Sequence, residues 1–109
     1  MRESKVEKAL RIALESMGGR CDKFIVPGRR NVPDRLCTIP FTPMFLVETK
    51  TTGLEPNDGQ WREIYRFRSR GVFVFVVDRE EQIPEVIGIA TNSKPRYRAY
   101  HEWVLRERF

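Results

Sequence analysis

Three ionisable residues stand at the two ends of one short hydrophobic stretch, PDRLCTIPFTPMFLVETK. Asp34 lies near its beginning, and Glu48 and Lys50 lie at its end. In a β-strand, side chains two apart project from the same face, so Glu48 and Lys50 stand side by side. If residues 35–39 and 44–50 form a hairpin, Asp34 comes to the same end as this pair. The spacing therefore predicts two carboxylates and an ammonium group at one corner of a sheet.

A corner of this composition offers oxygen ligands only. The carboxylates of Asp34 and Glu48, with the backbone carbonyl of Thr49 near the same edge, suit Mg²⁺ or Mn²⁺ rather than zinc. The ammonium group of Lys50 can orient or deprotonate a water, or stabilise negative charge that develops on a phosphate. The alternative is an ordinary surface ion pair between Glu48 and Lys50 on an edge strand, which contributes little. Residue types alone leave both interpretations open.

Two further polar residues are candidates for the same corner. Gln60 lies in the first turn of a predicted helix over 58–69, at the margin of its apolar stripe. Glu7 lies at the edge of the apolar stripe of a predicted helix over 3–17, and Glu3 falls on the same face. Periodicity does not separate Glu7 from Glu3. For each of these residues taken alone, a solvated surface position is the commoner outcome.

The two predicted helices are amphipathic. The first is expected to bury apolar residues spaced three and four apart: Val6, Ala9, Leu10, Ala13, Leu14 and Met17. The second is expected to begin at a cap residue, Asn57 or Asp58, and to bury Trp61, Ile64, Tyr65 and Phe67. Glycines follow both patterns and end them.

Strands are predicted at 21–26, 35–39, 44–50 and 72–77 from apolar runs bounded by turn residues. The last of these, VFVFVV, shows no polar alternation and is expected to be covered on both faces. Beyond it the pattern weakens, and we expect a short strand at 85–90 and a final helix after Pro95. The order α–β–β–β–α–β predicts an α/β (α+β) domain with a small mixed sheet flanked by helices.

Length and composition indicate one globular domain spanning residues 1–109, with the candidate residues in its first two thirds. The longest apolar run falls far short of the roughly 18 residues that cross a bilayer. The N-terminal residues alternate charged and apolar types, so we expect neither signal peptide nor membrane anchor, and a cytoplasmic location. The two cysteines, Cys21 and Cys37, lack partners at zinc-ligand spacing and are expected to be buried thiols.

The net charge of +5 comes largely from arginine clusters interleaved with aromatic residues, as in YRFRSR and PRYRAYHEW. Guanidinium groups in such clusters suit a phosphate backbone, although a solvated basic face has the same composition. The aromatic residues of the tail are candidates for a dimer surface, for stacking on unpaired bases or, more commonly, for covering the core: Tyr97, Tyr100, Trp103 and Phe109.

The ordered set formed by Glu7, PGRRNVPDRL, FLVETK and GQWREIYRF resembles the virus-type replication-repair nuclease (VRR-NUC) domain, a family of the PD-(D/E)xK nuclease superfamily. The resemblance covers roughly residues 5–78, and the tail over 79–109 matches no family pattern. The chain departs from the family in two places. Asn31 stands where the family usually has Gly, and the turn IPFTPMF has prolines where glycines are usual. Asn is the next most tolerant residue of a left-handed backbone.

The resemblance implies a role for each candidate residue. Asp34 and Glu48 would be the principal Mg²⁺ or Mn²⁺ ligands, Glu7 a further ligand favoured over Glu3 by family spacing, and the Thr49 carbonyl would complete the site. Lys50 would be the catalytic lysine, and Gln60 an active-site partner. Four basic residues would hold the DNA backbone near the scissile phosphate: Lys23, Arg29, Arg30 and Arg35.

The function that the resemblance implies is hydrolysis of DNA phosphodiester bonds by a metal-dependent endonuclease. Small members of the family are phage-encoded homodimers that act on branched DNA such as Holliday junctions or flaps. A symmetric dimer also follows from the chemistry, because cutting both strands of a junction needs two sites. Two other classes remain open at this point: a non-catalytic basic nucleic-acid-binding module, and a small interaction protein with no nucleic-acid role.

Overall fold

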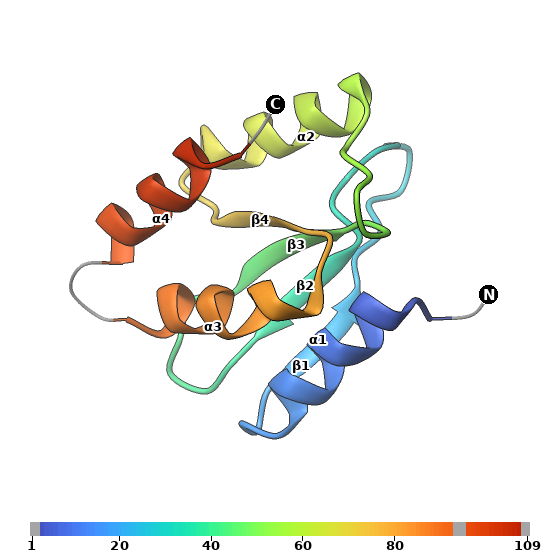
Figure 1. Ribbon diagram of the computed structural model, residues 1–109. Helices are drawn as coiled ribbons and strands as arrows, with labels where there is room; N and C mark the ends of the chain where they lie inside the picture. The colour runs from blue at the N-terminus through green and yellow to red at the C-terminus, as the bar shows by residue number, and fades with distance from the viewer. Residues whose placement is uncertain (1–2, 93–95, 108–109) are drawn as a thin grey trace.

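The computed structural model describes residues 3–92 and 96–107 and shows a mixed sheet flanked by helices (Figure 1). Its strands are β1 (Arg20–Lys23), β2 (Arg35–Thr38), β3 (Phe45–Thr49) and β4 (Val74–Val77). Its helices are α1 (Lys5–Glu15), α2 (Asp58–Arg68), α3 (Ile83–Thr91) and α4 (Arg96–Leu105), with a 3-10 turn η1 (Glu80–Gln82) before α3. The predicted α+β class and the order α–β–β–β–α–β are confirmed.

The strands lie in the order β1-β2-β3-β4. The first three pair antiparallel, and β3 pairs parallel with β4 because α2 carries the chain back across the sheet. Arg35 is opposite Val47 in the hairpin, and Glu48 is opposite Val76 in the parallel pair. Residues 44–50 and 35–39 thus form the predicted hairpin, and β4 is buried along its whole length as expected.

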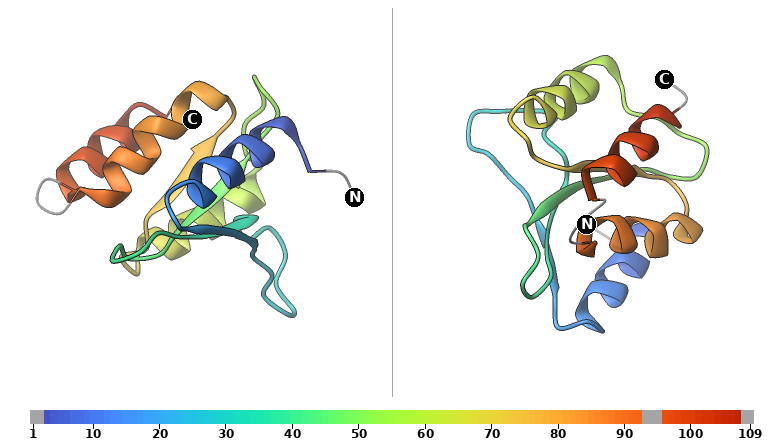
Figure 2. Two further views of the ribbon diagram at one scale, coloured as in Figure 1. Left: turned by 90° about the horizontal axis from the view of Figure 1, so that it is seen from below. Right: turned by 90° about the vertical axis from the view of Figure 1, so that its left-hand side faces the viewer.

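Two hydrophobic cores hold the layers together. Side chains of α1, α3 and α4 pack with one face of the sheet around Leu10, Leu14 and Phe75. On the other face, α2 packs Ile64 against Leu46 and β4. The last helix, α4, lies beside β4 between α2 and α3 (Figure 2). Within the described residues, no helix combines the length and the apolar character needed to span a membrane.

Both of the first two helices start at capping boxes. Ser4 and Glu7 exchange hydrogen bonds at the start of α1, and Asn57 and Gln60 do the same at the start of α2. The predicted apolar faces are mostly correct, but two of their members are wrong. Met17 was predicted to be the last buried residue of the first helix, but it is exposed because α1 already ends at Glu15. On α2, Tyr65 is exposed, and Glu63 is buried instead.

Two residues other than glycine adopt the left-handed backbone conformation. Asn31 has a φ of 67°, at the position where the VRR-NUC pattern usually has glycine. Phe41, at the tip of the β2–β3 hairpin, has a φ of 61°. The hairpin therefore reverses without glycine, at the cost of a strained phenylalanine whose side chain is fully exposed.

The prediction of a strand at 85–90 is wrong, because the segment belongs to α3. Pro84 at the start of α3 fits a helix N-terminus, where the missing N–H is not needed. Ile83, Val86, Ile89 and Ala90 are buried at helical spacing. The predicted final helix is present as α4.

Of the tail aromatics, Tyr100 and Trp103 join the first core, so the core-covering interpretation holds for both. Tyr97 is exposed, and Phe109 lies outside the described residues. Cys21 and Cys37 are buried free thiols, as expected.

Candidate active site

The hairpin brings Asp34, Glu48 and Lys50 to one end of the sheet. Asp34 immediately precedes β2, and the pairing of Arg35 with Val47 places it beside Glu48 on the neighbouring strand. The Nζ atom of Lys50 lies 3.8 Å from Oε2 of Glu48. The predicted juxtaposition of two carboxylates and one ammonium group is therefore present.

Glu48 is an unusual carboxylate because it is almost completely buried, with 4% of its surface exposed. Burial and, to a lesser extent, the negative charge of Asp34 raise its pKa to about 7, because the positive charge of Lys50 only partly offsets these two effects. Such a group is far from the exposed ion pair that was the alternative for Glu48 and Lys50. A burial this costly points to a functional role.

Asp34 is held by Thr49. The backbone N–H of Thr49 donates to Oδ1 of Asp34 at 2.9 Å, and the Thr49 hydroxyl donates to Oδ2 at 2.5 Å. Burial raises the pKa of Asp34, while these hydrogen bonds from Thr49 lower it and the nearby charge of Glu7 raises it. Sequence reasoning assigned Thr49 only a carbonyl ligand and missed this positioning role.

The donor set fits a hard divalent cation. The raised pKa values show that Asp34 and Glu48 are difficult to ionise together, and Lys50 offsets this only in part; a divalent cation would stabilise both carboxylates in their charged form. Within the described part of the chain, no group of three His, Cys, Asp or Glu side chains is arranged to hold a metal ion. The preformed part of the site is thus the pair Asp34 and Glu48, without a third acid.

Glu7, the predicted third acid, is committed elsewhere. Its Oε2 accepts hydrogen bonds from Nε and Nη2 of Arg35 at 3.1 and 2.7 Å, and its Oε1 accepts from the Ser4 N–H. Although burial opposes them, these bonds hold the pKa of Glu7 below its usual range. Glu3 instead pairs with Arg11. Through Arg35, Glu7 is therefore tied to β2, the strand that follows Asp34, and both of its carboxylate oxygens already accept hydrogen bonds.

Arg35 does not have the place expected of a DNA contact. It is 8% exposed, and its guanidinium is bonded to Glu7. Because Arg35 is the first residue of β2 and its side chain turns toward α1, it ties the helix to the strand that follows Asp34. The structure thus replaces the expected phosphate contact with an internal ion pair.

Gln60 caps α2 rather than contacting the carboxylates. Its Oε1 accepts the N–H of Asn57 at 2.9 Å, and its own N–H donates to the Asn57 side chain. The capping box uses the Oε1 atom and the backbone N–H of Gln60. The start of α2 nevertheless adjoins the basic loop, because a Cβ atom at Gly59 would come within 2.6 Å of Nδ2 of Asn31.

The basic loop and α2 form a continuous arginine surface. Glu63, only 4% exposed, binds Arg29 through Nε at 3.2 Å and Nη2 at 2.7 Å, and also pairs with Arg66. Two adjoining grooves of about 290 and 570 Å³ run along this surface. Their arginines are Arg29, Arg30, Arg62, Arg66 and Arg70.

Lys23 and Arg30, the remaining predicted DNA contacts, are exposed, Lys23 at the end of β1 and Arg30 in the loop. The part of the surface contributed by α2 was not assigned from the sequence. Its signal was present as arginines at four-residue spacing, but a buried acid among them was not foreseen.

The site defines the class as a PD-(D/E)xK-type arrangement: an acid before one strand, and acid–x–Lys on the next. No family model matches the sequence. The chain is 40% identical over 81 residues to "Putative nuclease p44" of Acyrthosiphon pisum secondary endosymbiont phage 1, covering 74% of this chain and 87% of that protein. A solved "VRR_NUC domain" superposes with a TM-score of 0.72 at 35% identity, covering 77% of this chain and 91% of that one.

The chain therefore belongs to the VRR-NUC family of nucleases. The identities and the coverage extend the likeness beyond the short motifs to most of the fold. The resemblance inferred from Glu7, the loop before Asp34, the ETK tripeptide and Gln60 is confirmed at the level of the family.

Proposed function

We propose that this protein is a metal-dependent endonuclease that hydrolyses phosphodiester bonds of DNA, with a preference for branched or structured DNA such as Holliday junctions or flaps. The observation that carries the proposal is the buried carboxylate of Glu48, with the half-buried carboxylate of Asp34 next to it and Lys50 at its side. Phosphate-ester hydrolysis in water-poor sites depends on charge neutralisation and on a positioned water.

Asp34 and Glu48 would hold Mg²⁺ or Mn²⁺, with the Thr49 carbonyl and, after release from Arg35, Glu7 as further ligands. When bound, the cation supplies polarisation of the phosphate and a lower pKa for a coordinated water. Thr49 keeps Asp34 oriented through its N–H and hydroxyl. Lys50 stands close enough to Glu48 to position the attacking water and to offset negative charge on the phosphate.

DNA as the substrate is supported by the net charge of +5 and by the arginine surface formed by α2 and the basic loop that leads to Asp34. Lys23, Arg29 and Arg30 would contact the phosphate backbone, joined by the arginines of α2, whereas Arg35 is withdrawn from this role. A homodimer would place two sites on one branched molecule. The phage relative supports the further proposal that this protein is phage-encoded and acts in the host cytoplasm.

The test is cleavage of a labelled four-way junction and its matching linear duplex, with Mg²⁺, Mn²⁺ or EDTA. The parent protein is expected to cut only with metal and to cut the junction faster. Lys50→Ala is expected to lower the cleavage rate by about 10²–10⁴-fold, the usual contribution of a positioned proton-transfer group, while DNA binding persists.

Binding without cutting in either metal would overturn the nuclease proposal. It would favour a non-catalytic binding module in which the carboxylates serve structure alone. Equal cutting of both substrates would retain the nuclease and remove the preference for branched DNA.

A further inference from the structure

One of the two edges of the sheet is β4, the last strand. The N–H of Leu46 donates to the carbonyl of Phe73, and the N–H of Lys50 donates to the carbonyl of Val77. Residues 73, 75 and 77 therefore turn their backbone groups toward β3. In this register Val74 and Val76 must direct theirs away from the sheet.

Side chains cap this edge on both sides of Val76. The Tyr100 hydroxyl accepts from the Val74 N–H at 2.9 Å and donates to the Val74 carbonyl at 2.8 Å. The N–H of Asp78 donates to Oε1 of Gln82 at 2.9 Å. Between them, the N–H and the carbonyl of Val76 have no partner among residues 3–92 and 96–107. The edge thus presents one donor and one acceptor from a single residue.

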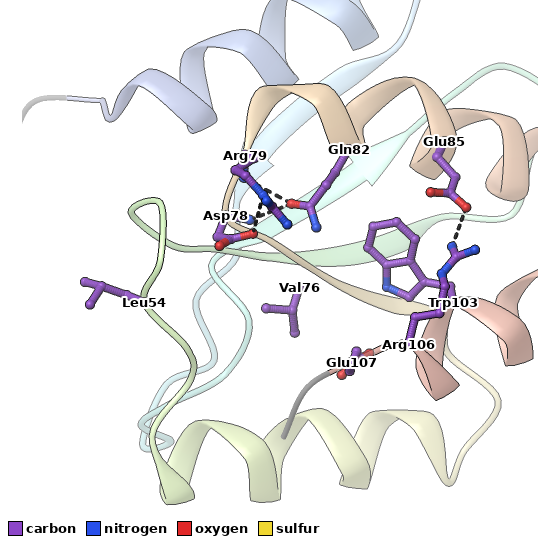
Figure 3. Close-up of a pocket in the computed structure, with 9 residues that line it drawn as sticks. All are labelled: Leu54, Val76, Asp78, Arg79, Gln82, Glu85, Trp103, Arg106 and Glu107. Atoms are coloured by element: carbon purple, nitrogen blue, oxygen red, sulfur yellow. Dashed lines mark hydrogen bonds and ion pairs between the residues drawn. The ribbon is translucent and has the colours of Figure 1, made fainter.

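A cavity of about 280 Å³ opens at this position. Trp103 of α4, Val76, the Asp78–Gln82 turn and Leu54 surround it, together with three charged residues, Glu85, Arg106 and Glu107 (Figure 3). Trp103 is 5% exposed, and its indole N–H is the one buried side-chain polar atom in the described part of the chain without a hydrogen-bond partner. In Figure 3 the indole nitrogen lies on the side of the ring that faces the cavity.

These groups match the hydrogen-bonding edge of a nucleobase. The adjacent N–H and carbonyl of Val76 complement an edge that carries an acceptor beside a donor, and the Trp103 N–H supplies a further donor. The indole ring and Leu54 give the cavity apolar surfaces, and the guanidinium of Arg106 lies 5.7 Å from the centre of the Trp103 ring. The volume lies near the lower limit of about 300 Å³ for small-ligand pockets, which suits one base rather than a base pair.

The cavity lies one strand away from the catalytic carboxylates. Glu48 and Val76 are paired residues of β3 and β4, and neighbouring strands are about 4.8 Å apart. The backbone of Lys50 is bonded to Val77, next to Asp78 in the cavity wall. A nucleotide whose phosphate approaches Glu48 can therefore bring its base toward this edge of the sheet.

We propose that the cavity at Val76 and Trp103 binds an unpaired base of the nucleic-acid substrate, close to the scissile phosphate. The inference rests on the proposed nuclease function and gives it a substrate class: DNA with an unpaired nucleotide near the cut. A base inside an intact duplex cannot present its pairing edge to a protein cavity without leaving the stack.

The experiment uses full-length protein carrying Lys50→Ala and two branched DNAs that are identical except at one unpaired position. One DNA carries a normal nucleotide there, and the other carries an abasic residue. The comparison is repeated with a set of such DNA pairs in which the unpaired position is moved nucleotide by nucleotide around the branch. The chain has only two tryptophans, so ¹⁵N–¹H spectra resolve two indole signals, and Trp103→Phe assigns them. Trp61, on α2, reports DNA binding in general.

The Trp103 indole signal is expected to shift only when the base is present at the correct position. The base-containing DNA should also bind about tenfold more tightly than the abasic DNA, since one buried hydrogen bond is lost without the base. Trp103→Phe should bring the ratio to near one. Because that change touches the core, Leu54→Phe provides a second variant: Leu54 is exposed, and a larger ring there should fill the cavity and abolish the discrimination.

Equal affinity for base-containing and abasic DNA at every position would overturn the inference while leaving the nuclease intact. Discrimination that survives both Trp103→Phe and Leu54→Phe would also overturn it. If the protein binds no DNA, the proposed function fails. Titration with deoxynucleoside monophosphates then tests separately whether the cavity binds a base. A saturable shift of the Trp103 signal alone supports a base site, and no shift overturns it.

Discussion

At the scale of residues, the catalytic corner works against the stability of the metal-free protein. Glu48 lies in a buried position beside a second carboxylate, and neither Lys50 nor the hydrogen bonds from Thr49 restore an ordinary pKa to the two acids. Thr49 orients Asp34 without neutralising it. The corner is held in place by the hydrophobic pairing of β2, β3 and β4 around it.

Glu48 should therefore make stability depend on pH in the absence of metal. Its pKa is about 7 in the folded protein against an ordinary value of 4.5, so between these pH values the folded state keeps a proton that the unfolded state has lost. The stabilisation is present below about pH 4.5 and is lost as pH rises through about 7, a change on the order of 3 kcal/mol.

Urea unfolding in EDTA at intervals from pH 5 to pH 8 measures this effect, with Glu48→Gln as the comparison. The neutral amide has nearly the same shape and cannot titrate, so its free energy of unfolding should fall less over this range. Parallel pH profiles for the two proteins would contradict the prediction. Added Mg²⁺ should stabilise the parent protein above pH 7 more than the Gln variant, since cation binding requires the deprotonated acid.

At the scale of elements, the β2–β3 hairpin turns through a strained residue. Phe41 has a φ of 61° and a fully exposed side chain, so the strain is not offset by packing. Phe41→Gly is expected to stabilise the protein by about 0.5–1 kcal/mol, because relief of the left-handed strain exceeds the added freedom of the unfolded chain. Phe41→Ala removes the same ring but keeps a Cβ atom, so it should leave stability nearly unchanged. Thermal unfolding of the three proteins separates these outcomes. If the Gly and Ala variants are stabilised equally, the effect comes from removal of the Phe41 ring and not from relief of backbone strain.

The same scale shows what local sequence could and could not predict. The hairpin and its charged ends follow from short-range alternation, and the left-handed Asn31 follows from its place in the family pattern. The segment 85–90 was misassigned because a short apolar run fits strand and helix alike; the preceding Ile83 and Pro84, when included, show helical spacing.

Contacts between distant elements were beyond local patterns. Arg35 and Glu7 are 28 residues apart, and Arg29 and Glu63 are 34 apart, so neither ion pair has a local signature. In both pairs, charged residues that the sequence suggests are free in solvent instead bind each other. The capping interaction between Gln60 and Asn57 is local, so it could be predicted from the sequence. The hydrogen bonds of Tyr100 to the edge of β4 join distant residues and could not.

At the scale of the whole molecule, the net charge of +5 is unevenly used. Several arginines are consumed by internal pairs, such as Arg68 with Glu107, while those of the grooves along α2 face solvent. Glu63 fixes Arg29 and Arg66 at the centre of this surface. The positive charge that remains available to bind phosphate is thereby concentrated along α2 and the basic loop.

The salt dependence of DNA binding tests this distribution. Each phosphate contact contributes about 0.9 to the slope of log K against log salt concentration, so Arg66→Gln with Arg70→Gln should reduce the slope by about 2. Arg11→Gln with Arg20→Gln removes the same net charge from α1 and β1 and serves as the matched control. Fluorescence anisotropy in EDTA measures both without cleavage. If the two double variants change the slope equally, net charge rather than the α2 surface governs binding.

The capping boxes of α1 and α2 have a consequence for how a phosphate meets this protein. Both helices begin on the same side of the molecule: Glu7 of α1 is bonded to the residue after Asp34, and the first turn of α2 adjoins the loop at Asn31 (Figure 1). Each helix start carries the equivalent of about half a positive charge from its aligned peptide dipoles. If DNA is the substrate, its backbone would meet two helix N-termini beside the carboxylates, and the acids in their first turns, Glu7 and Asp58, offset part of this positive charge.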